Sequence, residues 1–573
     1  MEKGIIAHKG ISIAKAFKLE KPKIIIKETT CDDINTCLKA FDQAILQSTN
    51  DLKTIKENAK DRLDSEHLAI FDAHIEMIND VELIKDVKDR IQNEHLHPAK
   101  AYDESTKAFI TMFESMEDEY FKERALDIKD IAYRVLSYLV GNPLKDLTLI
   151  DEPIILIAKD LTPSDTALLN KTFVLGFITE LGGYTSHTAI MARALDIPAI
   201  VGVKGIMDAV KNGDLIALDA IDHEISIHPS ETLINNLKKK KQIYLDQLAS
   251  FHAFKDKATK TQDGHSVKLY ANIGSSNDIP SLIANGAEGV GLFRTEFLFM
   301  DSQTMPTLDD QIKAYKDVFD AIDPVIVRTL DIGGDKALPY LKQDQEDNPF
   351  LGERAIRLCF NEVDLFKTQL KALLIASKDQ SACRIMFPMI ARLDELVKAK
   401  KILNEVTIAL DQENIAYQKN IKVGIMIEIP SAALNISAFK GHIDFISIGS
   451  NDLIQYLYAA DRMNEKVAYL YEPFDPTLLR LLNDIITKAR DANIESGLCG
   501  ELGGVKEIAL LLVAMQIDEI SMTPAHILEI RALLSTVTKK SLDELLADVL
   551  ALDSAGAVKD RINKYLEDKN EKH

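Results

Sequence analysis

Apolar residues recur along the chain at two different spacings, and the changes between them divide it into regions. Near the N-terminus, short apolar runs at residues 5–7 and 11–14 are broken by glycines, which is typical of strands and a turn. From about residue 31 to residue 140, apolar positions follow the three-to-four-residue spacing of helices, with charged residues between them. This region is predicted to form long antiparallel helices.

Short strands separated by turns and helical stretches follow the helical region. The predicted strands are residues 154–158, 173–178, 199–203 and 215–219, and helical stretches lie at 165–169 and 188–195. We interpret this segment as a compact α/β domain that the N-terminal strands join, which makes the helical region an insertion. A polar, lysine-rich stretch at residues 232–260 predicts a connecting helix.

Eight strand-like runs alternate with amphipathic helices in the C-terminal half of the chain. They are residues 268–273, 289–293, 325–330, 384–389, 423–429, 445–448, 495–499 and 519–522. Their number and spacing favour a (β/α)₈ barrel of the TIM type, although the periodicity also fits an open doubly wound sheet. We therefore predict a multidomain α/β protein with an α/β domain at 1–22 and 144–230, an inserted helical domain at 23–143, a connecting helix at 231–261 and a barrel at 262–573.

Composition restricts the partners and the location of the protein. A net charge of −21 argues against a broad nucleic-acid-binding surface, which would need to be basic. No apolar run approaches the roughly 20 residues that a membrane-spanning helix requires, and the N-terminus does not resemble a signal peptide. The five cysteines are scattered and odd in number, so we expect a cytoplasmic protein with reduced thiols.

One histidine stands in a setting suited to phosphoryl transfer. His187 follows a predicted strand and a glycine pair at 182–183, and Thr185, Ser186 and Thr188 surround it. Glycines let the backbone approach a ligand closely, and hydroxyl residues at a helix start accompany free backbone N–H groups that favour anions. These residues suggest a phosphoryl-carrying histidine, and they fit a helix-capping turn with a surface histidine about equally well.

A second group of polar residues stands where the barrel strands are predicted to end, which is where such barrels carry their active sites. It contains arginines, carboxylates and a thiol, namely Arg294, Arg328, Arg462, Glu428, Asp452 and Cys499. Guanidinium groups suit phosphate and carboxylate oxygens, and two carboxylates can hold Mg²⁺ together with a substrate phosphate. Each residue alone has an ordinary structural explanation, but their convergence predicts a small phosphorylated carboxylate as the ligand.

Eight stretches of sequence, in order along nearly the whole chain, carry a family resemblance. They are residues 161–164 (LTPS), 182–193 (GGYTSHTAIMAR), 197–202 (IPAIVG), 286–300 (GAEGVGLFRTEFLFM), 327–336 (VRTLDIGGDK), 348–357 (NPFLGERAIR), 449–456 (GSNDLIQY) and 497–502 (GLCGEL). With these stretches the chain resembles enzyme I of the phosphoenolpyruvate-dependent sugar phosphotransferase system. That family transfers a phosphoryl group from phosphoenolpyruvate to a carrier protein through a histidine of its own.

The resemblance implies a role for each matching residue. His187 would carry the phosphoryl group, with Thr166 positioning its ring, and Cys499 would protonate the enolpyruvate that remains. A thiol with the ordinary pKa of ~8.5 is mostly protonated at neutral pH, which agrees with that role. Glu428 and Asp452 would hold Mg²⁺. Phosphoenolpyruvate would be bound by Arg294, Arg328, Arg354, Asn451, Arg462 and Lys336.

The resemblance also implies partners. The phosphocarrier protein HPr would dock on the inserted helices, and a homodimer would form through the barrel. The family's docking face falls on Glu66, His67, Phe71, His74 and Met77. Helical spacing places Phe71 and His74 near one face, but Phe71 and Met77 fit the core of a helical bundle equally well. An acidic enzyme and a basic carrier would attract each other.

The chain departs from the family pattern at a few positions near the expected site. Tyr184 stands where relatives often have an arginine beside the active histidine, and Ser450 replaces a threonine. Glu353 replaces an aromatic residue, and its carboxylate could pair with Arg354. None of these changes removes a group that the reaction needs.

Two other functions remain open on the sequence. A pyruvate phosphate dikinase or phosphoenolpyruvate synthase would share the histidine domain and the barrel, but would also carry a large ATP-binding domain, and only about 120 inserted residues precede the histidine here. A non-catalytic phosphoenolpyruvate sensor would be expected to lack His187 or Cys499, and both are present. Because His187 and the barrel rim belong to different predicted domains, transfer would require the histidine domain to swivel.

Overall fold

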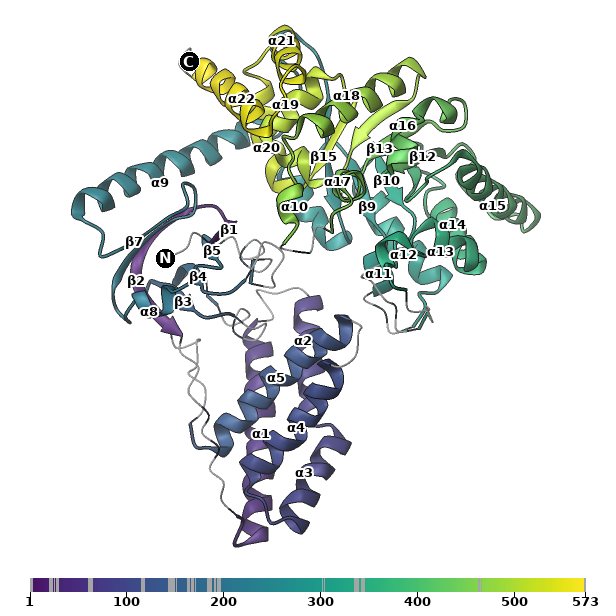
Figure 1. Ribbon diagram of the computed structural model, residues 1–573. Coiled ribbons are helices and arrows are strands. Elements are labelled where there is room, and N and C mark those ends of the chain that lie inside the picture. The colour runs from purple at the N-terminus through teal and green to yellow at the C-terminus, as the bar shows by residue number, and fades with distance from the viewer. Residues whose placement is uncertain are drawn as a thin grey trace. The chain divides into compact units, whose positions relative to one another are not determined.

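The computed structural model divides into two compact units, Met1–Asp246 and Gln247–His573, and each is described by itself (Figure 1). The described residues are 4–570, apart from 20–23, 25, 27–29, 60–64, 115–118, 143–149, 151, 162–164, 166–168, 171, 183–187, 190–191, 193–196, 301, 303, 334–337, 339, 342–345, 462–463 and 465. Within this part of the chain, no helix is both long and apolar enough to cross a membrane.

The first unit contains a mixed seven-stranded sheet in the order β1-β5-β4-β3-β2-β6-β7. Its strands are β1 (Ile5–His8), β2 (Ile11–Leu19), β3 (Ile154–Ala158), β4 (Val174–Thr179), β5 (Ala199–Val201), β6 (Leu215–Asp219) and β7 (Glu224–Ile227), and a short helix α8 (Ile206–Ala209) precedes β6. The four central strands β5, β4, β3 and β2 run parallel, and the remaining pairs are antiparallel. The N-terminal strands therefore join the α/β domain, as predicted.

Two apolar cores cover the two faces of this sheet. On β3, Leu156 belongs to one buried cluster, whereas Ile155 and Ile157 belong to the other. A strand with both faces covered has no polar side, and this explains why β3 is a continuous apolar run in the sequence. The parallel pairing of β3 with β4 brings the ends of these two strands to the same edge of the sheet.

Five helices form the predicted helical region, and they appear as long rods in Figure 1. Their apolar positions share one core, in which the rings of Phe41 and Tyr102 lie 5.9 Å apart. Asp80 caps the third helix by accepting a hydrogen bond from the backbone N–H of Leu83 at 2.8 Å. The helices are α1 (Ile34–Ala59), α2 (Ser65–Ile78), α3 (Val81–Asn93), α4 (Pro98–Glu114) and α5 (Glu119–Leu139).

A disulfide joins Cys31 to Cys37 at the start of this helical region. The expectation that the thiols are reduced is therefore wrong for this pair, while Cys359, Cys383 and Cys499 are free and buried. Cys31 precedes α1, and its N–H donates to the carbonyl of His95 at 2.8 Å. The entering segment is thus held close to the first turn of α1, a proximity that the spacing of the cysteines did not reveal.

A single long helix, α9 (Glu231–Phe251), and a 3₁₀ turn, η2 (His252–Phe254), form the connecting stretch. Lys240 holds α9 on the sheet of the first unit, because its ammonium group pairs with Asp219 and lies 2.6 Å from Asp222. The helix ends nine residues before the predicted end at 260. The exact domain boundaries given above stay predictions.

Eight parallel strands close into a barrel in the second unit, which confirms the barrel and excludes the open sheet. The strands are β8 (Lys268–Ile273), β9 (Val290–Arg294), β10 (Val325–Arg328), β11 (Arg384–Phe387), β12 (Lys422–Ile427), β13 (Phe445–Ile448), β14 (Glu495–Leu498) and β15 (Glu519–Met522). Side chains alternate between two cores: Phe445 packs inside the barrel with Met386 and Met426, whereas Ile446 packs among the residues of the surrounding helices.

Helices surround the barrel and connect its strands (Figure 1). The α-helices are α10 (Ile279–Ala284), α11 (Glu296–Met300), α12 (Leu308–Phe319), α13 (Ile356–Asn361), α14 (Val363–Ala376), α15 (Leu393–Gln412), α16 (Pro430–Leu434), α17 (Ser450–Tyr458), α18 (Pro476–Asp491), α19 (Lys506–Ala514), α20 (Ile527–Leu534), α21 (Lys539–Leu550) and α22 (Ala555–Asn570). Short 3₁₀ turns add η3 (Ser276–Asp278), η4 (Pro349–Leu351), η5 (Ile436–Phe439), η6 (Ala468–Leu470), η7 (Glu501–Gly504) and η8 (Pro524–His526).

Candidate active site

Polar residues gather where the barrel strands end, as predicted. Arg294 is the last residue of β9 and Arg328 the last of β10, while Glu428 directly follows β12 and Cys499 directly follows β14. Because all eight strands are parallel and the barrel is closed, their carboxyl ends share one rim. Residues that are up to 205 positions apart in the sequence, such as Arg294 and Cys499, therefore reach the same end of the barrel.

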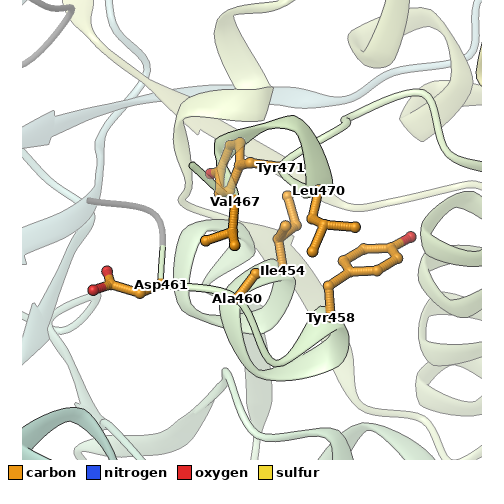
Figure 2. Close-up of a pocket in the computed structure, with 7 residues that line it drawn as sticks. All are labelled: Ile454, Tyr458, Ala460, Asp461, Val467, Leu470 and Tyr471. Atoms are coloured by element: carbon orange, nitrogen blue, oxygen red, sulfur yellow. The ribbon is translucent and has the colours of Figure 1, made fainter. Parts of the chain in front are cut away.

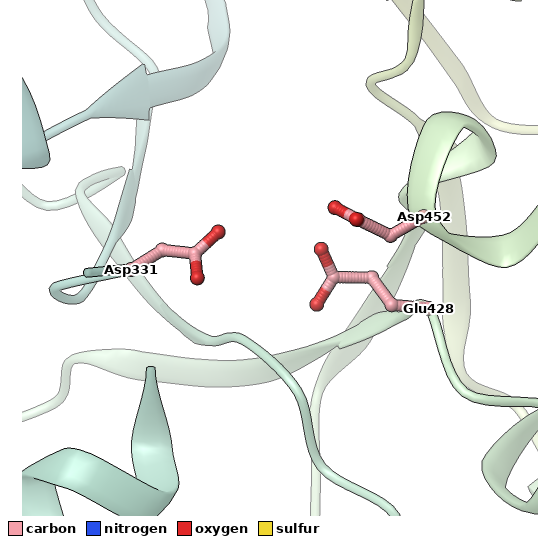
Figure 3. A group of neighbouring side chains, drawn as sticks. All are labelled: Asp331, Glu428 and Asp452. Carbon is pink, nitrogen blue, oxygen red and sulfur yellow. The ribbon is translucent and has the colours of Figure 1, made fainter. Parts of the chain in front are cut away.

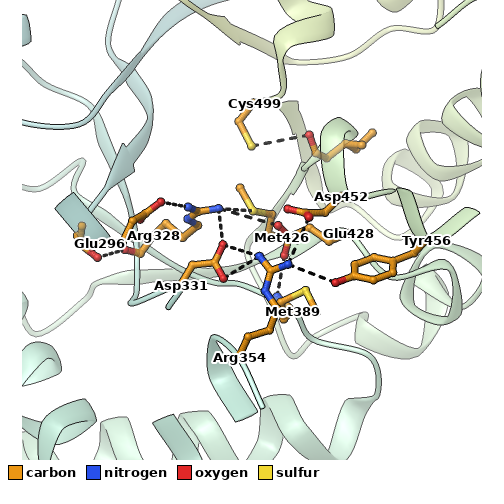
Figure 4. A network of polar contacts seen from close by, with 12 residues as sticks. Glu296, Arg328, Asp331, Arg354, Met389, Met426, Glu428, Asp452, Tyr456 and Cys499 are labelled. Carbon is orange, nitrogen blue, oxygen red and sulfur yellow. Dashed lines mark hydrogen bonds and ion pairs between the residues drawn. The ribbon is translucent and has the colours of Figure 1, made fainter. Parts of the chain in front are cut away.

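Arg328 lies at the centre of a buried network of charges (Figure 4). Its Nη2 pairs with the carboxylate of Glu296, its Nη1 lies 3.0 Å from Oδ2 of Asp331, and the same nitrogen lies 4.0 Å from Oε1 of Glu428. Burial alone would lower the pKa of Arg328, but the charges of Glu296 and Asp331 outweigh it and raise the pKa above its usual value. The guanidinium therefore stays charged while it is 6% exposed.

Arg354 joins the same network from the segment before α13. Its Nη2 lies 3.0 and 3.1 Å from the two oxygens of Asp331, and its Nη1 lies 3.4 Å from Oδ1 of Asp452 and 3.3 Å from the hydroxyl of Tyr456. Burial alone would lower the pKa of Arg354. The charges of Asp331 and Asp452 have a larger, opposite effect, so the pKa is raised above its usual value. Gly333 permits this approach: its φ is +110°, and a Cβ there would lie 2.7 Å from the side chain of Arg354.

Asp331, Glu428 and Asp452 form a group whose carboxylate oxygens lie within 4.8 Å of one another (Figure 3). All three side chains are buried, and the N–H of Met389 donates to Glu428 at 2.8 Å. Burial, followed by the charges of Asp452 and Asp331, raises the pKa of Glu428 to about 8. Three buried carboxylates at such close range fit a hard divalent cation such as Mg²⁺, which prefers oxygen ligands. Glu428 and Asp452 were predicted as ligands, and Asp331 was not.

Arg294 differs from Arg328 and Arg354 because its guanidinium is open, which here means that no carboxylate of the described residues pairs with it. It lies 4.8 Å above the ring centroid of Phe297, and among the described residues none forms a hydrogen bond or an ion pair with it. Burial lowers the pKa of Arg294, partly offset by the charge of Glu296. A half-buried arginine without a carboxylate partner is suited to an anionic ligand.

Cys499 directly follows β14, and its side chain packs among the apolar residues inside the barrel. Its Sγ donates to the carbonyl of Ile448 at 3.7 Å, and Asn272 donates from its side-chain nitrogen to the carbonyl of Cys499 at 2.9 Å. Burial raises the pKa of Cys499 to about 12, against the opposing effect of Ser447. The thiol is therefore protonated at neutral pH, as a proton donor must be, and a pKa this high also makes it a weaker acid than an ordinary thiol.

Several predicted residues lie outside the described part of the chain. They are His187, Thr166, Arg462 and Lys336, and the docking residues Glu66 and His67 have no described side chains. Next to His187, Thr188 is buried, and its hydroxyl lies 3.1 Å from Oδ1 of Asp160 and 3.3 Å from the carbonyl of Leu161. This contact places the residue after His187 beside the segment that follows β3, close in sequence to Thr166.

Two details of the sequence prediction can be judged from side-chain burial and pairing. Phe71 and His74 are 1% and 0% exposed, so they belong to the helical core and do not lie on an outer docking face; Met77 is partly buried in the same core. The carboxylate of Glu353 accepts a hydrogen bond from Asn361, whereas Arg354 pairs with Asp331 and Asp452.

The sequence matches three families of domains of PEP-utilising enzymes. The description "PEP-utilising enzyme, N-terminal" covers residues 3–124, "mobile domain" covers 150–222, and "PEP-binding domain" covers 249–539. The last of these ranges contains all eight barrel strands and the site residues at their carboxyl ends.

Similar proteins cover the chain almost completely. The phosphoenolpyruvate-protein phosphotransferase of Geobacillus stearothermophilus is 46% identical over 557 residues, which are 97% of this chain and 96% of that protein. Proteins of the same name from Priestia megaterium and Listeria innocua are each 45% identical, over 97% and 98% of this chain and 97% and 99% of their own lengths. The chain belongs to the phosphoenolpyruvate–protein phosphotransferase family of PEP-utilising enzymes.

Proposed function

We propose that this protein transfers the phosphoryl group of phosphoenolpyruvate to its own His187 and then to a histidine of the phosphocarrier protein HPr, releasing pyruvate. The observation that carries this proposal is that the unpaired guanidinium of Arg294 and the buried group of Asp331, Glu428 and Asp452 belong to the same rim of the barrel, with Arg294 next to Arg328 on the neighbouring strand. Carboxylates that could hold a cation, on the same rim as an arginine without a carboxylate partner, suit a phosphorylated carboxylate. The names and near-complete coverage of the similar proteins support the same reaction.

Substrate binding is assigned to the arginines of the rim and their neighbours. Arg294 meets the substrate with its free guanidinium, while Arg328 and Arg354 keep a fixed orientation through their carboxylate partners. Fixed positive groups stabilise the charge that develops on a transferring phosphoryl group without having to reorganise. Asn451, Lys336 and Arg462 complete the proposed contacts.

Mg²⁺ is assigned to Glu428 and Asp452, and Asp331 is close enough to take part or to orient the other two through the arginines. When bound, the ion would neutralise phosphate charge.

Cys499 supplies the proton. As the bond between phosphorus and the enol oxygen breaks and the bond to the histidine nitrogen forms, the enolpyruvate left behind takes a proton from the thiol at its methylene carbon. The product is pyruvate.

The proposed path also requires movement and partners. His187 must reach the barrel rim and then HPr, so we assign it to a swivelling domain of residues 1–22 and 144–230, with the helical domain at 23–143 as the HPr-binding part, the connecting helix at 231–261 and the barrel at 262–573. A cytoplasmic homodimer formed through the barrel is part of the same proposal.

Labelled phosphoenolpyruvate tests the function directly. The full chain is incubated with ³²P-phosphoenolpyruvate and Mg²⁺, and His187→Ala is compared with His228→Ala, which removes an exposed histidine of the same unit. We expect acid-labile label on the wild type and on His228→Ala, transfer of that label to HPr, and none on His187→Ala. Label that persists on His187→Ala, or that requires ATP or AMP, would contradict the proposal.

A further inference from the structure

Tyr471 donates a hydrogen bond from its hydroxyl to Oδ1 of Asn451, at 2.9 Å. Asn451 is the second residue of α17 and directly precedes Asp452. Tyr471 comes from a different segment, directly after the 3₁₀ turn η6. The contact thus ties a side chain at the rim of the barrel to a neighbouring loop, and no prediction from the sequence involved this tyrosine.

The bond favours one orientation of the Asn451 amide, because the Tyr471 hydroxyl acts as the donor and Oδ1 as the acceptor. A carboxamide has an acceptor oxygen and a donor nitrogen at nearly equal positions, and it can turn over to exchange them. With Oδ1 engaged by Tyr471, the donor Nδ2 is left for another partner, and among the described residues none accepts from it. Asn451 also stands in the first turn of α17, where backbone N–H groups favour an anion.

Tyr471 packs against the helix that carries Asn451. It lines a small hollow, too narrow for a water molecule, together with Ile454 and Tyr458 of α17 and residues of the following loop (Figure 2). Within that loop, the N–H of Val467 donates to the carbonyl of Asn464 at 3.0 Å, and further bonds join 464 to 461 and 470 to 467. The described residues before Tyr471 are thus joined by backbone hydrogen bonds, and Tyr471 packs with Ile454 and Tyr458 of the helix that carries Asn451.

We propose that Tyr471 is a positioning residue, which holds the amide of Asn451 so that its N–H groups, and not its carbonyl, meet the phosphate of phosphoenolpyruvate. The inference rests on the proposed function of the barrel rim. Without the hydroxyl, the amide is free to turn its oxygen toward a phosphate oxygen, where the two acceptors repel each other. Only the phosphate end of a ligand is affected by this change.

The test compares two substitutions that each remove one hydroxyl from the same hollow. Tyr471→Phe removes the bond to Asn451, whereas Tyr458→Phe removes a bond of 2.7 Å to Asp475, away from the rim. In full-length protein with Mg²⁺ and HPr, we expect Tyr471→Phe to lower kcat/KM for phosphoenolpyruvate about tenfold, which is the order of one hydrogen bond to a charged group. Tyr458→Phe is expected to stay within twofold.

Oxalate distinguishes a positioning effect on Asn451 from a general disturbance of the site. This dicarboxylate can bind the same arginines and Mg²⁺ as phosphoenolpyruvate, but it has no phosphate. We expect its inhibition constant to change by less than twofold in Tyr471→Phe. A double-mutant cycle adds a second criterion: in the Asn451→Ala background, Tyr471→Phe should have no further effect, because the group through which it acts is gone.

Each outcome has one meaning. If the wild type transfers label but Tyr471→Phe resembles Tyr458→Phe, the inference is wrong and the proposed function stands. Equal losses for phosphoenolpyruvate and oxalate, or additive losses with Asn451→Ala, also overturn it, because they show a structural effect on α17. If the wild type takes no label from phosphoenolpyruvate, the proposed function itself has failed.

Discussion

Asp331 links two arginines of the rim: one carboxylate oxygen lies 3.0 Å from Nη1 of Arg328, and both oxygens lie within 3.1 Å of Nη2 of Arg354. Arg328 and Arg354 come from different segments, and each is 6% exposed. A buried guanidinium needs a fixed counter-charge to stay in place. Asp331 therefore provides the shared counter-charge that orients both side chains.

Replacing Asp331 should disrupt both orientation and metal binding. We expect Asp331→Asn to lower kcat/KM for phosphoenolpyruvate about a hundredfold, the order seen when one preorganised electrostatic group is lost. We also expect the Mg²⁺ concentration for half-maximal activity to rise, because one of the three clustered carboxylates is gone. Asp317→Asn, an exposed position on α12, is the matched control. An unchanged Mg²⁺ requirement in Asp331→Asn would separate Asp331 from the metal.

Cys499 allows a prediction about pH. Because its pKa is raised to about 12, the thiol remains protonated below that value, so proton donation should not weaken between pH 6 and pH 9. Cys499→Ala should slow pyruvate release about 10²- to 10⁴-fold, while single-turnover labelling of the protein from phosphoenolpyruvate persists. Rapid-quench measurement of both products tests this. A wild-type alkaline limb centred near pH 9 that disappears in Cys499→Ser would show that the thiol titrates much lower.

Glu519 should make the barrel less stable as the pH rises. It begins β15 inside the barrel, and burial raises its pKa to about 8 from a reference value of 4.5, against the opposing charge of Arg384. Between these two values the folded state keeps a proton that the unfolded chain has released. Stability therefore falls with rising pH in this window, by at most about 1.4 kcal/mol per pH unit.

Glu519→Gln should remove that slope, since the amide does not titrate. Scanning calorimetry from pH 5 to pH 9 measures it through the Tm of the barrel, and Glu544→Gln, an exposed change on α21, is the control. Equal slopes for the wild type and Glu519→Gln would mean that Glu519 is ionised in the folded barrel.

The cysteine pairing can be counted by mass. Protein denatured without a reductant and then alkylated should gain three alkyl groups, on Cys359, Cys383 and Cys499, because Cys31 and Cys37 are joined. After reduction, the same treatment should add five. Five groups without reduction would mean that the pair is a dithiol in the isolated protein.

The regular elements could be read from apolar periodicity. The predicted bounds of β8, β13 and β15 agree with the structure, because each is an apolar run interrupted at both ends by turn or charged residues. Strand β7 was missed, since its four residues are exposed or half-buried at the edge of the sheet and form too short a run to stand out. Closure of the barrel could not be read this way, because it depends on the pairing of β8 with β15, which are the first and last barrel strands along the chain.

The sequence by itself determined which residues stand at the carboxyl ends of the barrel strands. Local apolar patterns show where each strand begins and ends along the chain, and the residues that follow each strand are then known. It therefore identified Arg294, Arg328, Glu428 and Cys499 individually. Only the tertiary structure decided which side chains contact each other. Asp331 pairs with two arginines, Arg294 has no carboxylate partner among the described residues, and Tyr471 binds the amide of Asn451. The physical reason is distance. Each of these contacts joins side chains from segments that are separate in the sequence. The apolar periodicity of a single helix or strand carries no information about which segments come together in space.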